Sequence, residues 1–440
     1  MYDIKNFLSK NFKSLNNKKV LCIYIFLTFS SYFFYWLLKY EIGIMGGGAI
    51  FFDRSDRFAD VLKIIVSFDF IFSNEDLIKL NVPESWIYGN PYSGIYFGNA
   101  TAAMSLPPLT IIFLTSTAHL TKIFATDYRV LFILLIFVLF VSSVFQILKF
   151  KNTFFYSLFL ITSYPFLFLI DRGNLMAGIS AIFLFPIFRK FIQNEHLNNL
   201  NILYFILACS IRPNYLIFGL LFLTKKNIKE NILNLFTIGF SFVSSNMLFF
   251  IFAKNIFPNY SFSNFRGMVN IYFENPLSFS HWNSSLYGAI FNTYRFLFQH
   301  LESNNLKIVS NFIDRVVYSP KLVDLITIVF IFLLLISYNN LIKNKVSRIS
   351  FLIIVCCTTV ITTHPIGDYH LVIFVFLFLI INNSNSASVY SGSLFAISLI
   401  ILPKVHMNSP NLNYFNLINV CSLLFLFYLN FYKYKIKNLM

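Results

Sequence analysis

Residues 322–342 of the chain read LVDLITIVFIFLLLISYNNLI, a run in which Asp324 is the only charged side chain. A transmembrane α-helix needs about 20 mostly apolar residues, because each residue rises about 1.5 Å and the hydrocarbon core of a bilayer is about 30 Å thick. The run is therefore predicted to cross a membrane. Eleven other apolar runs are predicted to do the same: 20–39, 128–148, 153–169, 173–190, 197–211, 213–224, 230–254, 348–363, 369–382, 386–403 and 412–432.

The composition agrees with this prediction. Of the 440 residues, 57% are hydrophobic and 12% are charged, whereas soluble domains are typically about 45–50% apolar and about 25% charged. The expected fold class is an all-α polytopic membrane protein with about 12 transmembrane helices. The net charge of +16 lies mostly in short loops between apolar runs, so membrane lipids are an expected partner and nucleic acid is not. The five cysteines fall in apolar runs and are interpreted as packing residues.

Basic loops predict the orientation of the chain. Residues 1–19 carry five lysines ahead of an uncleaved signal anchor and should form a cytoplasmic tail, as should residues 433–440. The other basic clusters then occupy alternate, cytoplasmic loops: Lys149/Lys151, Arg189/Lys190, Lys225/Lys226/Lys229 and Lys343/Lys345/Arg348. If all of these loops are cytoplasmic, the run 106–124 must be a re-entrant segment, because a full crossing there would place every later loop on the opposite side of the membrane. The transmembrane domain 20–432 would thus have two large outer loops, 41–127 and 255–321.

The first outer loop contains an unusual concentration of charge, FFDRSDRFADVLK at residues 51–63. Its apolar positions recur at helical spacing and predict an amphipathic helix lying on the membrane; they are Phe58, Val61, Leu62 and Ile65. Asp53, Asp56 and Asp60 would share one face of that helix. Grouped carboxylates suit a general base, because like charges and partial desolvation raise the pKa of one of them. A solvated helix face with Asp–Arg pairs explains the same composition equally well.

Further polar motifs are expected on the same outer face. Arg172 in Asp171-Arg172-Gly173-Asn174 and Arg212 in Ile211-Arg212-Pro213-Asn214 could each bind a phosphate bidentately. The first motif could instead be a salt-bridged helical hairpin, but phosphate binding is the favoured interpretation. His364, Asp368 and His370 crowd a short turn without the spacing of a standard metal site. A histidine that hydrogen-bonds a phosphate is the favoured interpretation.

Two remaining observations bear on function. Aromatic, amide and hydroxyl groups mix around Asn283 in the loop 255–321, which is typical both of sugar sites and of aromatic belts at membrane interfaces. The chain has no Walker loop, no Gly-x-Gly-x-x-Gly and no Gly-x-Ser-x-Gly. Nucleotide-driven transport and serine hydrolysis therefore lack support.

Seven short motifs follow one another in the interval 53–371: FADVLK (58–63), NPY (90–92), LPPL (106–109), DRGN (171–174), RPN (212–214), NSSL (283–286) and DYHL (368–371). Their order resembles the GT-C membrane glycosyltransferases, particularly the family 87 branch of polyprenyl-phosphate-sugar-dependent mannosyl- and arabinosyltransferases. The resemblance implies the GT-C fold, a polyprenyl-phosphate-sugar donor and a glycan or glycolipid acceptor, with no cofactor and no metal. It also implies a bacterial inner membrane with the active site on the periplasmic or extracellular face.

The resemblance further implies roles for individual residues. The family's Ala-Asp motif falls on Ala59-Asp60, so Asp60 is the first candidate for the catalytic base, with Asp56 and Asp53 behind it. The residues implied in phosphate or substrate binding are Arg172, Asn174, Arg212, Asn283, Asp368 and His370.

Two other functions compete with this one. An O-antigen-type polysaccharide polymerase also uses lipid-linked sugars, but such enzymes depend on arginines in large outer loops, whereas here the first acidic loop dominates. A lipid-linked glycan flippase or other transporter should place ionisable groups within its spans or show internal repeats, and the sequence shows neither clearly.

Overall fold

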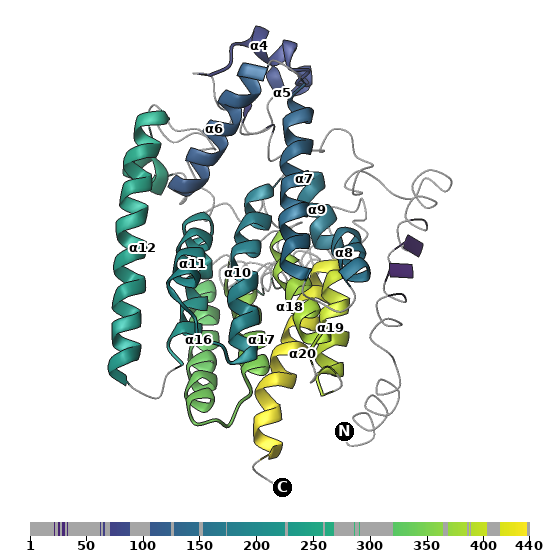
Figure 1. The fold of residues 1–440 in the computed structure, drawn as a ribbon, viewed down its shortest axis with the longest axis vertical. Helices are drawn as coiled ribbons and strands as arrows, with labels where there is room; N and C mark the ends of the chain where they lie inside the picture. The colour runs from purple at the N-terminus through teal and green to yellow at the C-terminus, as the bar shows by residue number, and fades with distance from the viewer. Residues whose placement is uncertain are drawn as a thin grey trace, which may run out of the picture.

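Every regular element that the structure describes is a helix (Figure 1). The structure, a computed structural model, describes residues 71–88, 106–124, 127–148, 153–172, 174–224, 228–257, 260–267, 320–363, 368–384, 389–402 and 414–437, with isolated positions at 22, 25, 26, 29, 30, 33, 62, 65, 66, 286, 290 and 387. The prediction of an all-α protein is confirmed for these residues.

The helices agree closely with the predicted apolar runs. In chain order they are α4 (Asn74–Lys79), α5 (Glu84–Ile87), α6 (Pro108–Phe124), α7 (Tyr128–Ile147), α8 (Thr153–Thr162), α9 (Tyr164–Arg172), α10 (Leu175–Gln193), α11 (Asn199–Ile211), the 3-10 helix η2 (Pro213–Phe222), α12 (Ile228–Ile256), α16 (Pro320–Ile342), α17 (Arg348–Thr362), the 3-10 helix η4 (Asp368–Leu371), α18 (Val372–Asn382), α19 (Ser391–Ile401) and α20 (Tyr414–Lys437).

The main hydrophobic core is built around α17 and α18. All eleven residues of α18 are buried, and α17 is buried from Ile349 to Ile361. A helix that is apolar on every side lies either inside a protein or in a membrane; here α10, α16, α19 and α20 pack around the pair. Aromatic rings fill much of the space between them: Phe159 stacks on Phe378 at 4.8 Å, and Phe185 lies 5.0 Å from Phe376.

Fewer spans can be identified among the described helices than the sequence predicts. Among the described helices, three are long and apolar enough to cross a membrane: Leu175–Gln193, Ile228–Ile256 and Asp324–Ile342. A fourth span arises if α8 and α9 count together, but they bend by 59°. The chain thus has the helices of a membrane protein, while the twelve spans remain a prediction.

The bend between α8 and α9 shows that the span predicted for 153–169 is not one continuous helix. Pro165 lies in the first turn of α9 and has no N–H to donate to the carbonyl four residues earlier. The chain therefore breaks at Ser163, between the two helices. Pro213 acts in the same way: it opens η2 and ends α11 at Ile211, so the predicted span 213–224 is a ten-residue 3-10 helix.

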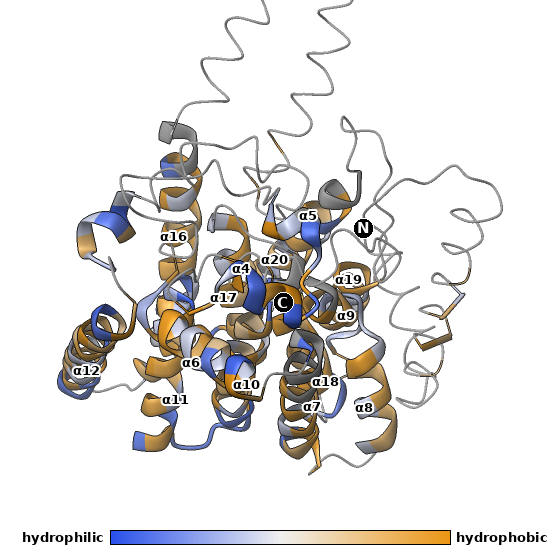
Figure 2. Cartoon of the chain, turned by 90° about the horizontal axis from the view of Figure 1, so that it is seen from above, coloured by the Kyte–Doolittle hydropathy of each residue, from blue (hydrophilic) through white to orange (hydrophobic). Residues whose placement is uncertain are grey.

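Helix α12 lies at the edge of the molecule and is largely apolar (Figure 2). Of its residues, only Ile238 and Ala253 are buried. Its exposed apolar side chains include Ile232, Leu233, Phe236, Phe240, Met247, Leu248, Ile251 and Phe252. Two amides attach it to the bundle, since Asn234 donates to the carbonyl of Phe222 and Asn246 to the hydroxyl of Ser210. Such interhelical hydrogen bonds, together with an apolar outer surface, are typical of a helix that faces lipid.

A second hydrophobic cluster, here called the cap, joins α4, α5 and α6 to the last turn of α12. Its buried residues are Leu62, Ile65, Ile71, Phe72, Leu77, Leu80, Val82, Trp86, Ile111, Ala118, Ala253, Phe257 and Tyr260. Helix α6 is one continuous helix of 17 residues packed against α12, and it is not among the described helices that qualify as spans.

The cap changes the interpretation of the acidic stretch. The sequence predicts that Leu62 and Ile65 lie on the membrane, but they are only 1% and 6% exposed and pack against protein. Their helical spacing is as predicted, and the N–H of Val66 donates to the carbonyl of Leu62. Residues 51–61, which include Asp53, Asp56 and Asp60, lie outside the described residues.

The buried core and the exposed surface of α12 predict different losses of stability for the same Phe→Ala substitution. Phe188 is 1% exposed and its ring lies 5.0 Å from that of Phe218, so Phe188→Ala should lower the free energy of unfolding by about 3–5 kcal/mol. Phe236 on α12 is 68% exposed, and Phe236→Ala should change it by no more than about 0.5 kcal/mol. Titration with a denaturing detergent would measure both, and equal losses would contradict this assignment of core and lipid-facing surface.

Candidate functional site

Three of the polar motifs meet at one end of the helical bundle. Helix α10 begins there and α11 ends there, while η4 packs against both α9 and α10. We call this the site end. The motif at 171–174 is thereby brought to the motif at 211–214 and to residues 368–371, although almost 200 residues separate the first from the last.

The central contact joins Arg212 to Asn174. A terminal guanidinium nitrogen of Arg212 donates to Oδ1 of Asn174 over 2.7 Å. Asn174 is also the N-cap of α10, where the same oxygen accepts from the N–H of Ala177 at 3.4 Å. The side chain of Asn174 therefore orients Arg212 beside the N-terminus of α10, which carries a partial positive charge.

The local sequence fixes Arg212 in place. Its backbone N–H donates to the carbonyl of Ala208 at 2.8 Å and completes the last turn of α11. Pro213 then forces an extended conformation on Arg212, which has φ −136° and ψ 89°. One residue further, the amide of Asn214 donates to the hydroxyl of Thr363 over 3.3 Å. That bond connects the Arg212 corner to the end of α17.

His370 lies in η4 and is only 5% exposed. Burial, and secondly the positive charge of Arg212, hold the pKa of His370 well below its usual value of 6.5. The imidazole is therefore neutral at pH 7. His370 can donate a hydrogen bond, but it adds no positive charge to the site.

Not all predicted site residues are described. Asp53, Asp56, Asp60 and Asn283 lie outside the described residues. Arg172 and Asp368 have described backbones only, at the end of α9 and the start of η4. Asn174, Arg212 and His370 are the predicted residues that the structure brings together.

The cap also lies at the site end. Helix α12 begins beside Phe222, at the far end of η2, and its opposite end supplies Ala253 and Phe257 to the cap. At 29 residues, α12 is about 43 Å long. The cap is therefore separated by the length of this helix from the end where α10 finishes, and it appears at the top of Figure 1.

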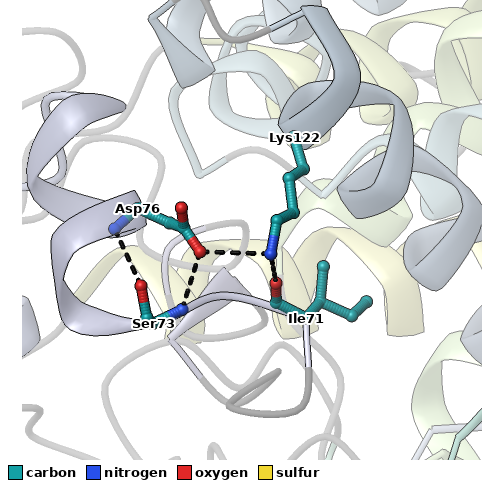
Figure 3. Close-up of polar contacts among 4 residues, drawn as sticks. All are labelled: Ile71, Ser73, Asp76 and Lys122. Atoms are coloured by element: carbon teal, nitrogen blue, oxygen red, sulfur yellow. Dashed lines mark hydrogen bonds and ion pairs between the residues drawn. The ribbon is translucent and has the colours of Figure 1, made fainter.

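A polar clamp holds the cap together (Figure 3). Asp76 forms an ion pair with Lys122 of α6 at 3.1 Å and accepts from the N–H of Ser73 at 3.0 Å. The Ser73 hydroxyl accepts from the N–H of Asp76, which completes a capping box at the start of α4. Lys122 also donates to the carbonyl of Ile71. The sequence-based site did not include this clamp; the Ser-x-x-Asp pattern at 73–76 was the available signal for the capping box, but not for the contact with Lys122.

The chemistry available at the Arg212 corner suits an anion. A guanidinium group, a helix N-terminus and a neutral imidazole are all donors that bind phosphate or carboxylate oxygens. A metal has no comparable site: among the described residues, no three His, Cys, Asp or Glu side chains gather around a common point.

The sequence matches no family model and no curated protein, and the structure matches no solved structure.

The depressed pKa of His370 predicts a pH dependence. In the unfolded chain His370 takes up a proton as the pH falls below 6.5, whereas in the folded protein it does so only at a lower pH. Its contribution to stability is thus complete above pH 6.5 and is lost progressively below that value. The melting temperature should fall between pH 7 and pH 5, and His370→Asn should flatten that slope. The same substitution at the exposed His196, beyond the other end of α10, should keep the wild-type slope; an unchanged slope in His370→Asn would contradict the buried neutral imidazole.

The ion pair between Asp76 and Lys122 predicts a second effect of pH, at more acidic values. The Ser73 N–H first, and Lys122 second, lower the pKa of Asp76 from 3.8 to about 2. The ion pair should therefore hold the cap closed above pH 4 and release it as the pH falls from 4 to 2. Fluorescence of Trp86, which is buried in the cap, would report this in a variant with Trp36→Phe and Trp282→Phe. Adding Asp76→Asn should remove the transition in that window, and its persistence would exclude the clamp as the cause.

Proposed function

We propose that this protein is an integral-membrane glycosyltransferase that moves a sugar, a hexose such as mannose or a pentose, from a polyprenyl-phosphate donor to a lipid-linked or cell-envelope glycan. The single observation that supports this most is the meeting of Asn174, Arg212 and His370 at the site end of the bundle. The three residues lie 38 and 158 positions apart in the sequence, and each contributes a donor or an orienting group to the same corner.

The donor's phosphate fits this corner chemically. Arg212 presents a planar fork of N–H groups that matches two phosphate oxygens, and Asn174 holds that fork beside the N-terminus of a 19-residue helix. His370 is neutral, so it can donate one hydrogen bond to the leaving phosphate without competing for the negative charge. Together these groups would stabilise the charge that develops as the sugar–phosphate bond breaks. We propose Arg172, Asn283 and Asp368 as further binding residues on the strength of their motifs.

The acceptor hydroxyl requires a base, and Asp60 is our proposal for it, with Asp56 and Asp53 as the alternatives. Asp60 precedes Leu62 by two residues, and Leu62 is anchored in the cap, at the same end of the bundle as Arg212. In the proposed step the Asp60 carboxylate takes the hydroxyl proton and the acceptor oxygen attacks the anomeric carbon. The bond from that carbon to the phosphate oxygen breaks with inversion, and polyprenyl phosphate leaves with the electron pair.

The distribution of charge supports an outward-facing site. The end opposite the Arg212 corner carries Arg189, Lys190, Lys343, Lys345 and Arg348, and loops rich in lysine and arginine face the cytoplasm in most membrane proteins. On this basis we propose that the site end opens to the periplasm or the cell exterior, in the inner membrane of a bacterium.

The test is to complement a deletion strain with variants and compare its envelope glycans by mass spectrometry. Asp60→Asn should lower sugar transfer by a factor of about 100 or more, as expected when a general base is removed. Arg212→Gln should lower it by about 100- to 1000-fold, and Arg212→Lys should recover only part of this, because the charge remains but the fork is lost.

Glu75→Gln provides the control, since Glu75 is an exposed carboxylate in the cap, and it should retain wild-type glycans. Equal melting temperatures would show that the variants fold. Wild-type glycans in Asp60→Asn, with loss in Asp56→Asn or Asp53→Asn, would move the base to that residue. Wild-type glycans in all three, and in Arg212→Gln, would refute the proposed enzyme.

A further inference from the structure

The end of the bundle opposite the site carries an excess of positive charge. Three contacts bring its segments together: Arg348 donates to the carbonyl of Phe191, Lys190 to Oδ1 of Asn201, and Tyr338 to the carbonyl of Leu223. The cations of the described side chains here, which we call the basic face, are Arg189, Lys190, Lys229, Lys343, Lys345 and Arg348, and the acids are Glu195 and Glu230. At the site end the described side chains carry equal numbers of positive and negative charges. The cations are Lys79, Lys122, Arg212, Lys254 and Arg266, and the acids are Glu75, Asp76, Glu84, Asp127 and Asp324.

Arg348 connects two helices at the basic face. It is half-buried, with its guanidinium 3.3 Å from the carbonyl of Phe191 and centred 5.1 Å over the Phe191 ring. This contact combines a cation–π interaction with a hydrogen bond at the C-terminal end of α10, where positive charge is favourable. It ties the start of α17 to the end of α10, so the loop with Lys343 and Lys345 is held near Lys190 in the last turn of α10.

The loop between α16 and α17 is rigid. The N–H groups of Lys345 and Val346 both donate to the carbonyl of Asn340, and Asn344 adopts a left-handed conformation with φ 56°. Val346 is buried in the main core. Lys343 and Lys345 are exposed on a loop whose backbone is already held by hydrogen bonds, so the loop backbone loses little additional conformational entropy when a ligand binds.

Exposed apolar side chains begin where these cations end. Phe332 and Leu335 of α16 are 63% and 50% exposed, and Leu200 and Leu203 in the first turns of α11 are 50% and 49% exposed. Lysines that border a lipid-facing surface stand at the level of the lipid head groups. A partner that contacts both regions needs a negatively charged head and an apolar tail, which is the chemistry of an anionic phospholipid. A soluble acidic protein would bind the cations but would leave these apolar side chains exposed.

We infer that the basic face binds the head groups of anionic phospholipids, with Lys343 and Lys345 as the main contacts and the acyl chains lying along the exposed sides of α11 and α16. The inference does not depend on the proposed glycosyl transfer. It places a lipid site at the end of the bundle opposite the Arg212 corner.

The test uses the purified full-length protein in a neutral detergent, titrated with dioleoyl-phosphatidylglycerol or dioleoyl-phosphatidylcholine while the melting temperature is followed. Phosphatidylglycerol should raise the melting temperature at concentrations at least about 10-fold lower than phosphatidylcholine. The double variant Lys343→Gln/Lys345→Gln should raise the phosphatidylglycerol concentration required by about 30-fold, because each lysine near a membrane surface contributes roughly 1 kcal/mol.

Lys79→Gln/Lys254→Gln is the matched control, because it removes the same charge from exposed lysines at the site end and should respond like the wild type. Free glycerol phosphate at the same concentrations should have no effect, since it lacks the tails. The inference fails if the wild type responds equally to both lipids, if the control variant loses as much response as the test variant, or if glycerol phosphate reproduces the shift.

Discussion

The complete burial of α17 and α18 is the constraint on which the rest of the structure depends. Both helices are buried along almost their whole length, because other helices enclose them. Helix α17 ends at Thr362 and α18 begins at Val372, so the connection that carries His370 must emerge at one end of this buried pair. The helices that enclose the pair bring Asn174 and Arg212 to that same end. The polar corner is thus a consequence of how the core packs.

Much of this arrangement could be predicted from the sequence. Apolar runs located the helices to within a few residues, and alternating basic loops placed the motifs around Asn174, Arg212 and His370 on one side. The sequence could not specify that His370 is neutral, because its pKa depends on burial and on Arg212, which is 158 positions away. Pro165 did signal the break between α8 and α9, since it cannot donate to the preceding turn. The pairing of Asp76 with Lys122 had no signal, because side chains 46 positions apart meet only through tertiary packing.

The two ends of the bundle differ in how they use charge. At the site end, charges are paired or oriented by specific partners, as Arg212 is by Asn174 and Asp76 by Lys122. At the basic face, Lys343 and Lys345 project from an ordered loop, and the six cations of the face outnumber its two acids. Oriented charge in a partly buried corner is suited to chemistry, because fewer water molecules screen it. Exposed charge of one sign is suited to holding a protein at a membrane surface.

The proposed role of the Arg212 corner can be tested most directly by finding where a polyprenyl phosphate binds. A photoreactive polyprenyl-phosphate analogue, cross-linked to the wild-type protein in lipid nanodiscs, would mark its site in peptides identified by mass spectrometry. Our account predicts adducts in the segments around Asn174, Arg212 and His370, and competition by unlabelled polyprenyl phosphate. Adducts confined to the basic face, or spread along α12 without competition, would contradict it.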